Sequence, residues 1–325
     1  VRQFFPGCEI LFVNRPNEVP PGSALIIWGM RDSGMTLPDG VRILRIEDGF
    51  VRSVGLGADL IRPVSWVIDD LGIYYDATRP SRLECILAEL VVDEVLLQRA
   101  ASLREKMVTS GLTKYNVGSG GWQHPGNGRQ VILVPGQVET DASIAYGAPE
   151  NQCQVQRNMD LLRAVRKANP DAWVVYKPHP DVLAGLRLKG LDEDTALQWC
   201  DEQVIDVPMG DLLNKVDEVH VITSLAGFEA LLRGKRVTCY GQPFYAGWGL
   251  TGDVAPFARR TRCLTLDELV AGCLILYPTY VSRVSQQFTS PELALDELLA
   301  WRAEAATGMP WWRKGLRFFL RFYKH

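Results

Sequence analysis

Short apolar runs alternate with polar and turn-rich segments along the first part of the chain. Gly, Pro, Asn and Asp bound these runs, a pattern that predicts buried strands. A longer helical pattern begins at Ser81, which has Glu84 at the capping-box position, and runs to about Val108, with or without a break in its middle. The strands expected in this part are residues 10–13, 24–28, 41–46 and 65–69.

Residues 117–129 are dense in Gly and Pro, which predicts a linker. From Gln130 to about residue 280 strands alternate with helices, an order typical of a parallel, doubly wound α/β sheet. Two such units joined by a linker leave a cleft between them, where a ligand is expected. We therefore expect three parts: a Rossmann-like unit over residues 1–125, a second over residues 126–285, and C-terminal helices over residues 286–325.

The stretch Val174–Val182 is the first candidate site. Its apolar half predicts a buried strand that ends at Pro178, which cannot donate to a ladder. Lys177 and His179 would then lie at the carboxyl end of a strand, where open α/β sheets bind their ligands. For a single His-Pro pair, a loop histidine without a ligand is the more common interpretation.

A second segment makes a phosphate site the better interpretation. Residues 219–230 read as an apolar strand followed by a helix, with Thr223 and Ser224 as N-cap candidates. Hydroxyls and free N–H groups at the start of such a helix bind phosphate. Two anion-binding segments after successive strands favour a nucleotide-binding unit.

Composition narrows the class of protein. The chain has 325 residues, enough for two domains, and its formal net charge of −3 gives no reason to expect a nucleic-acid partner. Seven cysteines without a Cys-x-x-Cys pair favour reduced thiols in a cytoplasmic compartment, and the four histidines are not spaced as metal ligands. No apolar run approaches the roughly 18–20 residues that span a bilayer. The sequence begins with Val1 rather than Met, so we expect a module of a longer chain.

Acidic residues supply candidate catalysts in both units. Glu47 and Asp48 end an expected strand, where crowded carboxylates can act as general acid or base; a polar turn is an equally good interpretation. Glu139 and Asp141 form a second pair after a strand of the other unit. The aspartates of residues 69–76 are better explained as an acidic turn. The aromatic and Gly-rich residues 244–251 could stack a base or a sugar, or form a packed loop.

Six motifs together resemble the capsule polysaccharide β-Kdo glycosyltransferases of KpsC type, where Kdo is 3-deoxy-D-manno-octulosonic acid. They cover nearly the whole chain in order, and the Pro-Gly-Gln-Val-Glu-x-Asp and Lys-Pro-His-Pro wording is closest to the carboxyl-terminal, retaining module of these tandem enzymes. The motifs are residues 47–53, 69–81, 135–143, 177–182, 223–231 and 239–251.

This resemblance implies a GT-B fold with an interdomain active-site cleft. It implies CMP-β-Kdo as donor, no cofactor, retention at the anomeric carbon, and a growing Kdo linker on a (lyso)phosphatidylglycerol lipid as acceptor, with a β-2,7 linkage as the expectation. It also implies a second transferase module in the same chain. The motifs are similar to those of bacterial sialyltransferases as well, but those enzymes invert configuration, whereas a β donor that gives a β product requires retention.

The resemblance assigns roles to individual residues. Glu47 or Asp48 would be the acid/base, and Asp141 the nucleophile that retention by double displacement requires. His179 and the Thr223–Ser224 pair would bind the CMP phosphate. The matched motifs add Glu139 to the catalytic candidates, and they give as further CMP- or Kdo-binding residues Arg52, Ser53, Gln137, Lys177, Pro180, Gly227, Glu229 and Gln242.

Two alternatives and the tail complete the expectations. The alternatives are an inverting CMP-sialic-acid-type GT-B transferase and a non-catalytic polysaccharide- or lipid-binding module; intact carboxylates at Glu47 and Asp141 count against the second.

The C-terminal tail has an unusual composition. Residues 311–325 carry five basic and eight large apolar or aromatic side chains and no acidic one. They read either as a helix packed on the protein or as an interfacial helix on the cytoplasmic face of the inner membrane, where a peripheral enzyme would meet its lipid acceptor.

Overall fold

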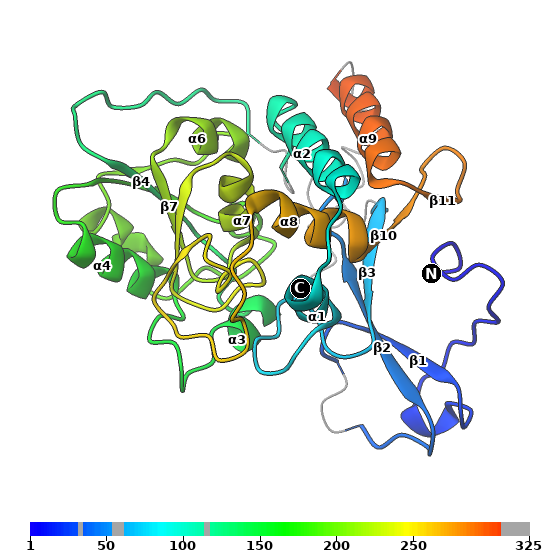
Figure 1. The fold of residues 1–325 in the computed structure, drawn as a ribbon. Helices are drawn as coiled ribbons and strands as arrows, with labels where there is room; N and C mark the ends of the chain where they lie inside the picture. Colours follow the sequence, from blue (N-terminus) through cyan, green and yellow to red (C-terminus); the bar gives the residue numbers. More distant parts are fainter. Residues whose placement is uncertain (32–34, 54–61, 114–117, 307–325) are drawn as a thin grey trace.

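Two β-sheets organise the structure, a computed structural model that describes residues 1–31, 35–53, 62–113 and 118–306 (Figure 1). The first sheet has the order β1-β2-β3-β10-β11, formed by Ala24–Trp28, Arg42–Asp48, Ser65–Asp69, Pro278–Val281 and Phe288–Thr289. The second has the order β6-β5-β4-β7-β8-β9, formed by Glu202–Gln203, Trp173–Lys177, Val131–Pro135, Glu218–Val221, Arg236–Cys239 and Gly252–Asp253.

Helices cover these sheets and connect their strands. The long helical pattern is broken into two helices, because Asp93 caps a new helix by accepting a hydrogen bond from the Leu96 N–H. None of the described helices is long and apolar enough to cross a lipid bilayer. Their bounds are α1 Arg82–Glu89, α2 Glu94–Thr109, α3 Ala142–Gly147, α4 Asn158–Ala168, α5 Pro180–Leu183, α6 Met209–Lys215, α7 Leu225–Leu232, α8 Leu266–Val270 and α9 Pro291–Ala306.

The second sheet is the parallel, doubly wound sheet that the sequence predicts. All its strand pairs are parallel. Alternate side chains of β4 enter different cores: Val131 and Leu133 pack in the cluster that contains Phe228 of α7, whereas Ile132 packs in the cluster that contains Leu162 of α4. The sheet therefore has helices on both faces, and its apolar strands are buried throughout.

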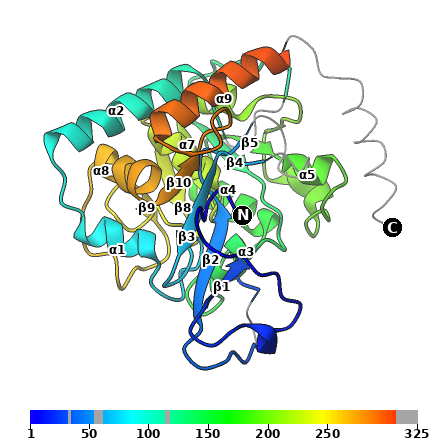
Figure 2. The same cartoon turned by 90° about the vertical axis from the view of Figure 1, so that its right-hand side faces the viewer.

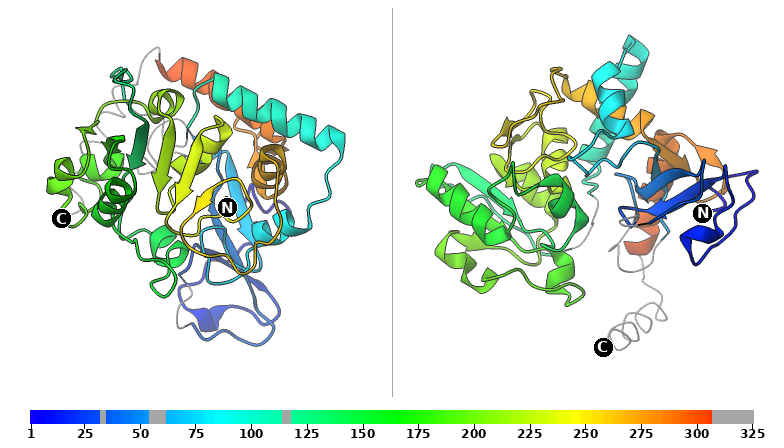
Figure 3. Two further views of the ribbon diagram at one scale, coloured as in Figure 1. Left: turned by 60° about the vertical axis from the view of Figure 1, so that its left-hand side comes forward. Right: turned by 90° about the horizontal axis from the view of Figure 1, so that it is seen from below.

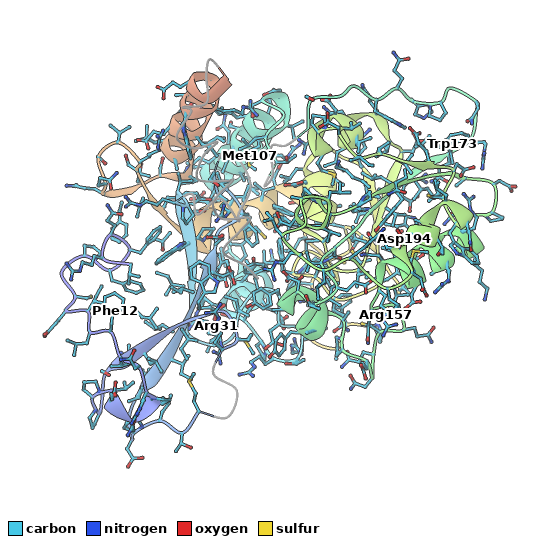
Figure 4. The ribbon with its side chains drawn as sticks, turned by 180° about the vertical axis from the view of Figure 1, so that it is seen from behind. Phe12, Arg31, Met107, Arg157, Trp173 and Asp194 are labelled. Atoms are coloured by element: carbon cyan, nitrogen blue, oxygen red, sulfur yellow. The ribbon has the colours of Figure 1, made fainter. Side chains whose placement is uncertain are left out.

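The first sheet differs from the expectation, because it is mixed. Only β1 and β2 pair in parallel; β3 is antiparallel to both β2 and β10. The described parts of the connection from β2 to β3, residues 49–53 and 62–64, contain no helix such as a parallel crossover usually needs. Residues 10–13 form no strand, and Phe12, labelled in Figure 4, is 78% exposed.

The chain returns to the first sheet at its end. Strands β10 and β11 complete that sheet after the second sheet has ended at β9. The chain therefore passes from the second sheet back to the first before β10, ahead of the domain boundary expected at residue 285. Helix α9 then runs beside α2, as Figures 1 and 2 both show. Figure 3 shows the strands of the two sheets on opposite sides of the molecule when it is seen from below.

One apolar cluster joins the two sheets. It contains Val67 of β3, Val219 of β7 and several aromatic rings. Phe50 stacks on Phe244 with 4.5 Å between ring centroids. Within residues 244–251 the rings of Tyr245 and Trp248 are fully buried, so this segment is mainly a packed loop.

A buried carboxylate organises the turn that follows β3. Asp69 is fully buried, and its Oδ1 accepts hydrogen bonds from the backbone N–H groups of Leu71 and Gly72, both at 2.9 Å. Its Oδ2 accepts from the Arg82 N–H and from the Tyr277 hydroxyl, both at 2.8 Å. Asp69 therefore ties β3 to the start of α1 and to the residue before β10, as the acidic-turn interpretation predicts.

This arrangement predicts a large difference between two variants. Asp69→Ala leaves four donors without their acceptor, of which the Gly72 N–H and the Tyr277 hydroxyl are buried. Each buried donor costs about 1–3 kcal/mol, so we expect the free energy of unfolding to fall by about 3 kcal/mol or more. Tyr277→Phe removes a single donor and should cost about 1 kcal/mol. Denaturant unfolding of both proteins measures the difference, and equal losses would show that Asp69 is not the centre of the turn.

Candidate active site

A cleft of about 870 Å³ lies where the carboxyl ends of strands from both sheets meet. The first sheet contributes the ends of β1 and β2 and the turn after β3. The second contributes the loops after β4, β5 and β7. The cleft is lined by most of the residues expected to be functional, namely Glu47, Asp48, Arg52, Gln137, Asp141, Lys177, His179, Pro180, Thr223, Ser224 and Glu229.

His179 is oriented by its own turn. It caps the short helix α5, and its Nδ1 accepts a hydrogen bond from the Asp181 N–H at 3.2 Å. In the neutral ring the proton therefore resides on Nε2, because Nδ1 is used as an acceptor. The side chain can thus present an N–H donor to an anion in the cleft.

The start of α7 forms the neighbouring wall. Ser224 caps this helix by accepting a hydrogen bond from the Ala226 N–H at 3.2 Å. The preceding Thr223 is clamped by Gln137, whose Oε1 accepts from the Thr223 N–H at 2.9 Å and whose Nε2 donates to the Thr223 hydroxyl at 3.1 Å. Gln137 therefore fixes the loop after β4 to the end of β7, and it holds the helix start against the cleft.

Lys177 lies at the bottom of this region, at the end of β5. Its side chain is buried and its Nζ donates to the Ile205 carbonyl at 3.1 Å. Burial lowers the pKa of the ammonium group, and the nearby Asp206 carboxylate partly opposes that change. The charge is thus anchored by the protein and faces the same space as His179.

The two carboxylates at the end of β2 differ in their surroundings. Asp48 forms a buried ion pair with the Arg52 guanidinium, which also donates to the Ser53 hydroxyl at 3.0 Å. This ion pair engages the Asp48 carboxylate within the protein. Glu47 is therefore the better candidate for proton transfer, while Ser53 supports Arg52 and does not line the cleft.

Asp141 approaches from the second sheet. It caps α3, and its Oδ1 accepts from the Ser143 N–H at 2.9 Å. The charges of Asp141 and Glu47 both act on Tyr75, whose pKa is raised first by burial and then by these two carboxylates. Carboxylates from opposite sheets thus lie around the same tyrosine.

Besides Ser53, three expected site residues lie outside the cleft lining, for clear physical reasons. Glu139 anchors α4, because its Oε1 accepts from the Asn158 N–H at 2.9 Å and its Oε2 from the Leu191 N–H at 3.3 Å. Gly227 leaves room for the ring of Tyr245 beside α7. The Gln242 amide donates to Gln152 at 2.9 Å and to the Pro256 carbonyl.

The structure also adds residues that sequence reasoning missed. Tyr74 and Tyr75 line the cleft. The sequence feature that could have identified them is the acidic and aromatic motif of residues 69–81, which contains both. Arg31 and Arg187 line it as well, without any signal in the sequence; Figure 4 labels Arg31 near the boundary between the two sheets. Within the described ranges, no three His, Cys, Asp or Glu side chains are grouped so that they could hold a metal ion.

Comparison with known proteins gives a consistent family. The model of the family described as "Capsule polysaccharide biosynthesis protein" matches residues 24–117 and 106–288. The capsule polysaccharide modification protein LipA of Neisseria meningitidis serogroup A is 44% identical over 302 residues, which are 90% of this chain and 42% of that protein. The lipopolysaccharide-processing protein LpsZ of Rhizobium meliloti is 44% identical over 79% of this chain and 59% of its own length. The chain thus spans about half the length of these curated relatives.

Two solved structures are similar over most of the chain. The β-Kdo 2,7 transferase of Thermosulfurimonas dismutans KpsC is 43% identical with a TM-score of 0.73, covering 86% of this chain and 85% of its own. The β-Kdo 2,4 transferase of the same protein is 32% identical with a TM-score of 0.72, covering 84% and 86%.

The geometry predicts that His179 contributes to binding of a nucleoside monophosphate. Replacing it by Ala removes a charge-assisted donor, so CMP affinity measured by calorimetry should fall about tenfold or more. His124→Ala is a matched control, because His124 also precedes a proline and accepts from the N–H two residues on, at 3.1 Å, outside the cleft. Unchanged CMP affinity of His179→Ala would remove this residue from the phosphate site.

Proposed function

The chain belongs to the capsule polysaccharide biosynthesis family, and from this membership we propose that it is a retaining β-Kdo glycosyltransferase that uses CMP-β-Kdo as donor. The observation that carries the proposal is the cleft, which is lined by Glu47 and Asp141 together with the loops after β5 and β7. The similarity to two KpsC Kdo transferase structures, with the two-sheet architecture of a GT-B enzyme, supports the same reaction.

The donor phosphate fits the second-sheet side of the cleft. Under the proposal, the His179 N–H and the positive N-terminal end of α7 bind the phosphate of CMP, and Lys177 adds its charge. These groups are fixed before the donor arrives, so they can stabilise the charge that develops as CMP leaves. Glu229, buried on α7 and facing the cleft, is the candidate ligand of the ribose hydroxyls.

The proposed reaction is a double displacement. An oxygen of Asp141 attacks the anomeric carbon of Kdo, the bond from that carbon to the phosphate oxygen breaks, and CMP departs with the electron pair. The acceptor hydroxyl then attacks the same carbon, its proton passes to Glu47, and the Asp141 carboxylate is released. Two inversions give net retention, and each step passes through an oxocarbenium-like state.

The linkage and the acceptor are the finer parts of the proposal. Identity to the β-2,7 transferase of KpsC, 43%, exceeds that to the β-2,4 transferase, 32%, which supports a β-2,7 linkage. We propose a Kdo-terminated (lyso)phosphatidylglycerol lipid as acceptor, and a second transferase module in the native chain. The enzyme would act in the cytoplasm, at the inner membrane.

The mechanism predicts a covalent Kdo adduct on Asp141. Intact-mass spectrometry after incubation with donor alone should show an increment of one Kdo residue that maps to the loop 135–143.

The mechanism also predicts the effect of replacing the general base. In Glu47→Gln we expect transfer to fall by about 100-fold or more, since general base catalysis contributes about 10²–10⁴-fold, with CMP affinity nearly unchanged. An adduct on another residue, or a product of inverted configuration, would contradict the assignment and favour a sialyltransferase-like reaction.

The composition of the tail predicts membrane binding. Residues 311–325 lie outside the described residues, and their five basic side chains would each contribute roughly 1 kcal/mol near an anionic surface. Liposome co-sedimentation should show more binding of the full chain than of a version ending at residue 308. Equal binding of the two proteins, or none by either, would rule out the tail as the membrane anchor.

A further inference from the structure

Tyr75 has a hydroxyl group that the fold does not use. The residue follows β3 in the turn organised by Asp69, is only 9% exposed, and lines the cleft. Among the described residues its hydroxyl has no hydrogen-bond partner, yet it is not one of the polar atoms sealed away from solvent. A buried tyrosine usually pairs its hydroxyl within the protein, so this group opens towards whatever occupies the cleft.

The position of this hydroxyl is set by a glycine. Gly29 follows β1 with a φ of +60°, and its N–H donates to the Ile46 carbonyl at 3.0 Å. A Cβ on Gly29 would lie 2.7 Å from the Tyr75 hydroxyl oxygen and 3.5 Å from Oε2 of Glu47. Gly29 thus lies beside both the Tyr75 hydroxyl and the Glu47 carboxylate, and a side chain at this position would push the hydroxyl away from Glu47.

The surroundings keep this hydroxyl protonated. Burial raises its pKa, and the charges of Glu47 and Asp141 raise it further. The group is therefore a hydrogen-bond donor at any working pH and not a nucleophile. Carboxylates such as those of Glu47 and Asp141 accept hydrogen bonds, whereas the Tyr75 hydroxyl beside them offers a donor that an oxygen of the sugar can accept.

We propose that Tyr75 contacts the substrate during transfer, donating a hydrogen bond to an oxygen of the sugar that lies between Glu47 and Asp141, and that Gly29 keeps this position open. The inference rests on the proposed function and adds two residues to it. It separates two sides of the cleft: the loops after β5 and β7 bind the nucleotide, while Tyr75 acts on the transferred sugar.

The first test is Tyr75→Phe in the full chain, with CMP-Kdo and a Kdo-terminated lipid acceptor. We expect kcat/KM for transfer to fall about tenfold, while CMP affinity by calorimetry stays within about twofold, because the nucleotide loops are untouched. Tyr280→Phe is the matched control, since it removes a buried hydroxyl that donates to the Leu274 carbonyl at 2.7 Å outside the cleft. Equal transfer by Tyr75→Phe and the unaltered protein, or parallel loss of CMP binding, would overturn the proposal.

The second test is a double-mutant cycle with Gly29→Ala. The new methyl group meets the Tyr75 hydroxyl in the unaltered background but not in the Phe background, whereas the strain of Ala at positive φ is common to both. Gly29→Ala should therefore reduce transfer less in the Tyr75→Phe background. An equal reduction in both backgrounds would overturn the role of Gly29. Absence of any Kdo transfer by the unaltered protein would instead overturn the proposed function, and this inference with it.

Discussion

Packing of aromatic rings between the two sheets is the constraint on which the candidate site depends. Phe50, three residues after Glu47, lies 4.9 Å from the Tyr74 ring and 4.5 Å from the Phe244 ring, measured between centroids. Phe244 in turn lies 5.3 Å from Phe228 of α7. The same contacts that join the sheets therefore fix the end of β2 and the turn before Tyr75 against α7, the helix that Ser224 caps.

A buried ion pair limits movement at this contact between the two sheets. Glu84 of α1 binds Arg260 at 3.1 Å and Arg259 at 2.6 Å, and Arg260 also donates to the Ala246 carbonyl at 2.7 Å. Burial lowers the pKa of Arg260, and the charge of Glu84 opposes that change. Separating α1 from the loop that carries Phe244 would leave charges buried without partners, which costs several kcal/mol. The ion pair between Glu84 and Arg260 thus favours one arrangement of the two sides of the cleft.

Local signals were enough to predict the second sheet and the positions of the loops after β5 and β7, but contacts between distant residues were not predictable. His124 and His179 have the same His-Pro sequence and the same hydrogen bond to the N–H two residues on; only the buried strand before His179 separates them. Glu139 and Asp141 look equivalent by spacing, yet the partner that makes Glu139 structural is Asn158, 19 residues away. The antiparallel direction of β3 also depends on β10, which the chain supplies only after residue 277.

Charge along the cleft is distributed as the proposed reaction requires. Asp48 is paired with Arg52, whereas the carboxylates of Glu47 and Asp141, which come from different sheets, lie around Tyr75. A negative environment there favours an oxocarbenium-like centre on the sugar. Donor groups with positive character gather at the loops after β5 and β7, where the negative phosphate would leave. Under the proposed mechanism, breaking the bond between sugar and phosphate would move positive charge towards these carboxylates and negative charge towards the start of α7, and the protein would stabilise both charges in the same step.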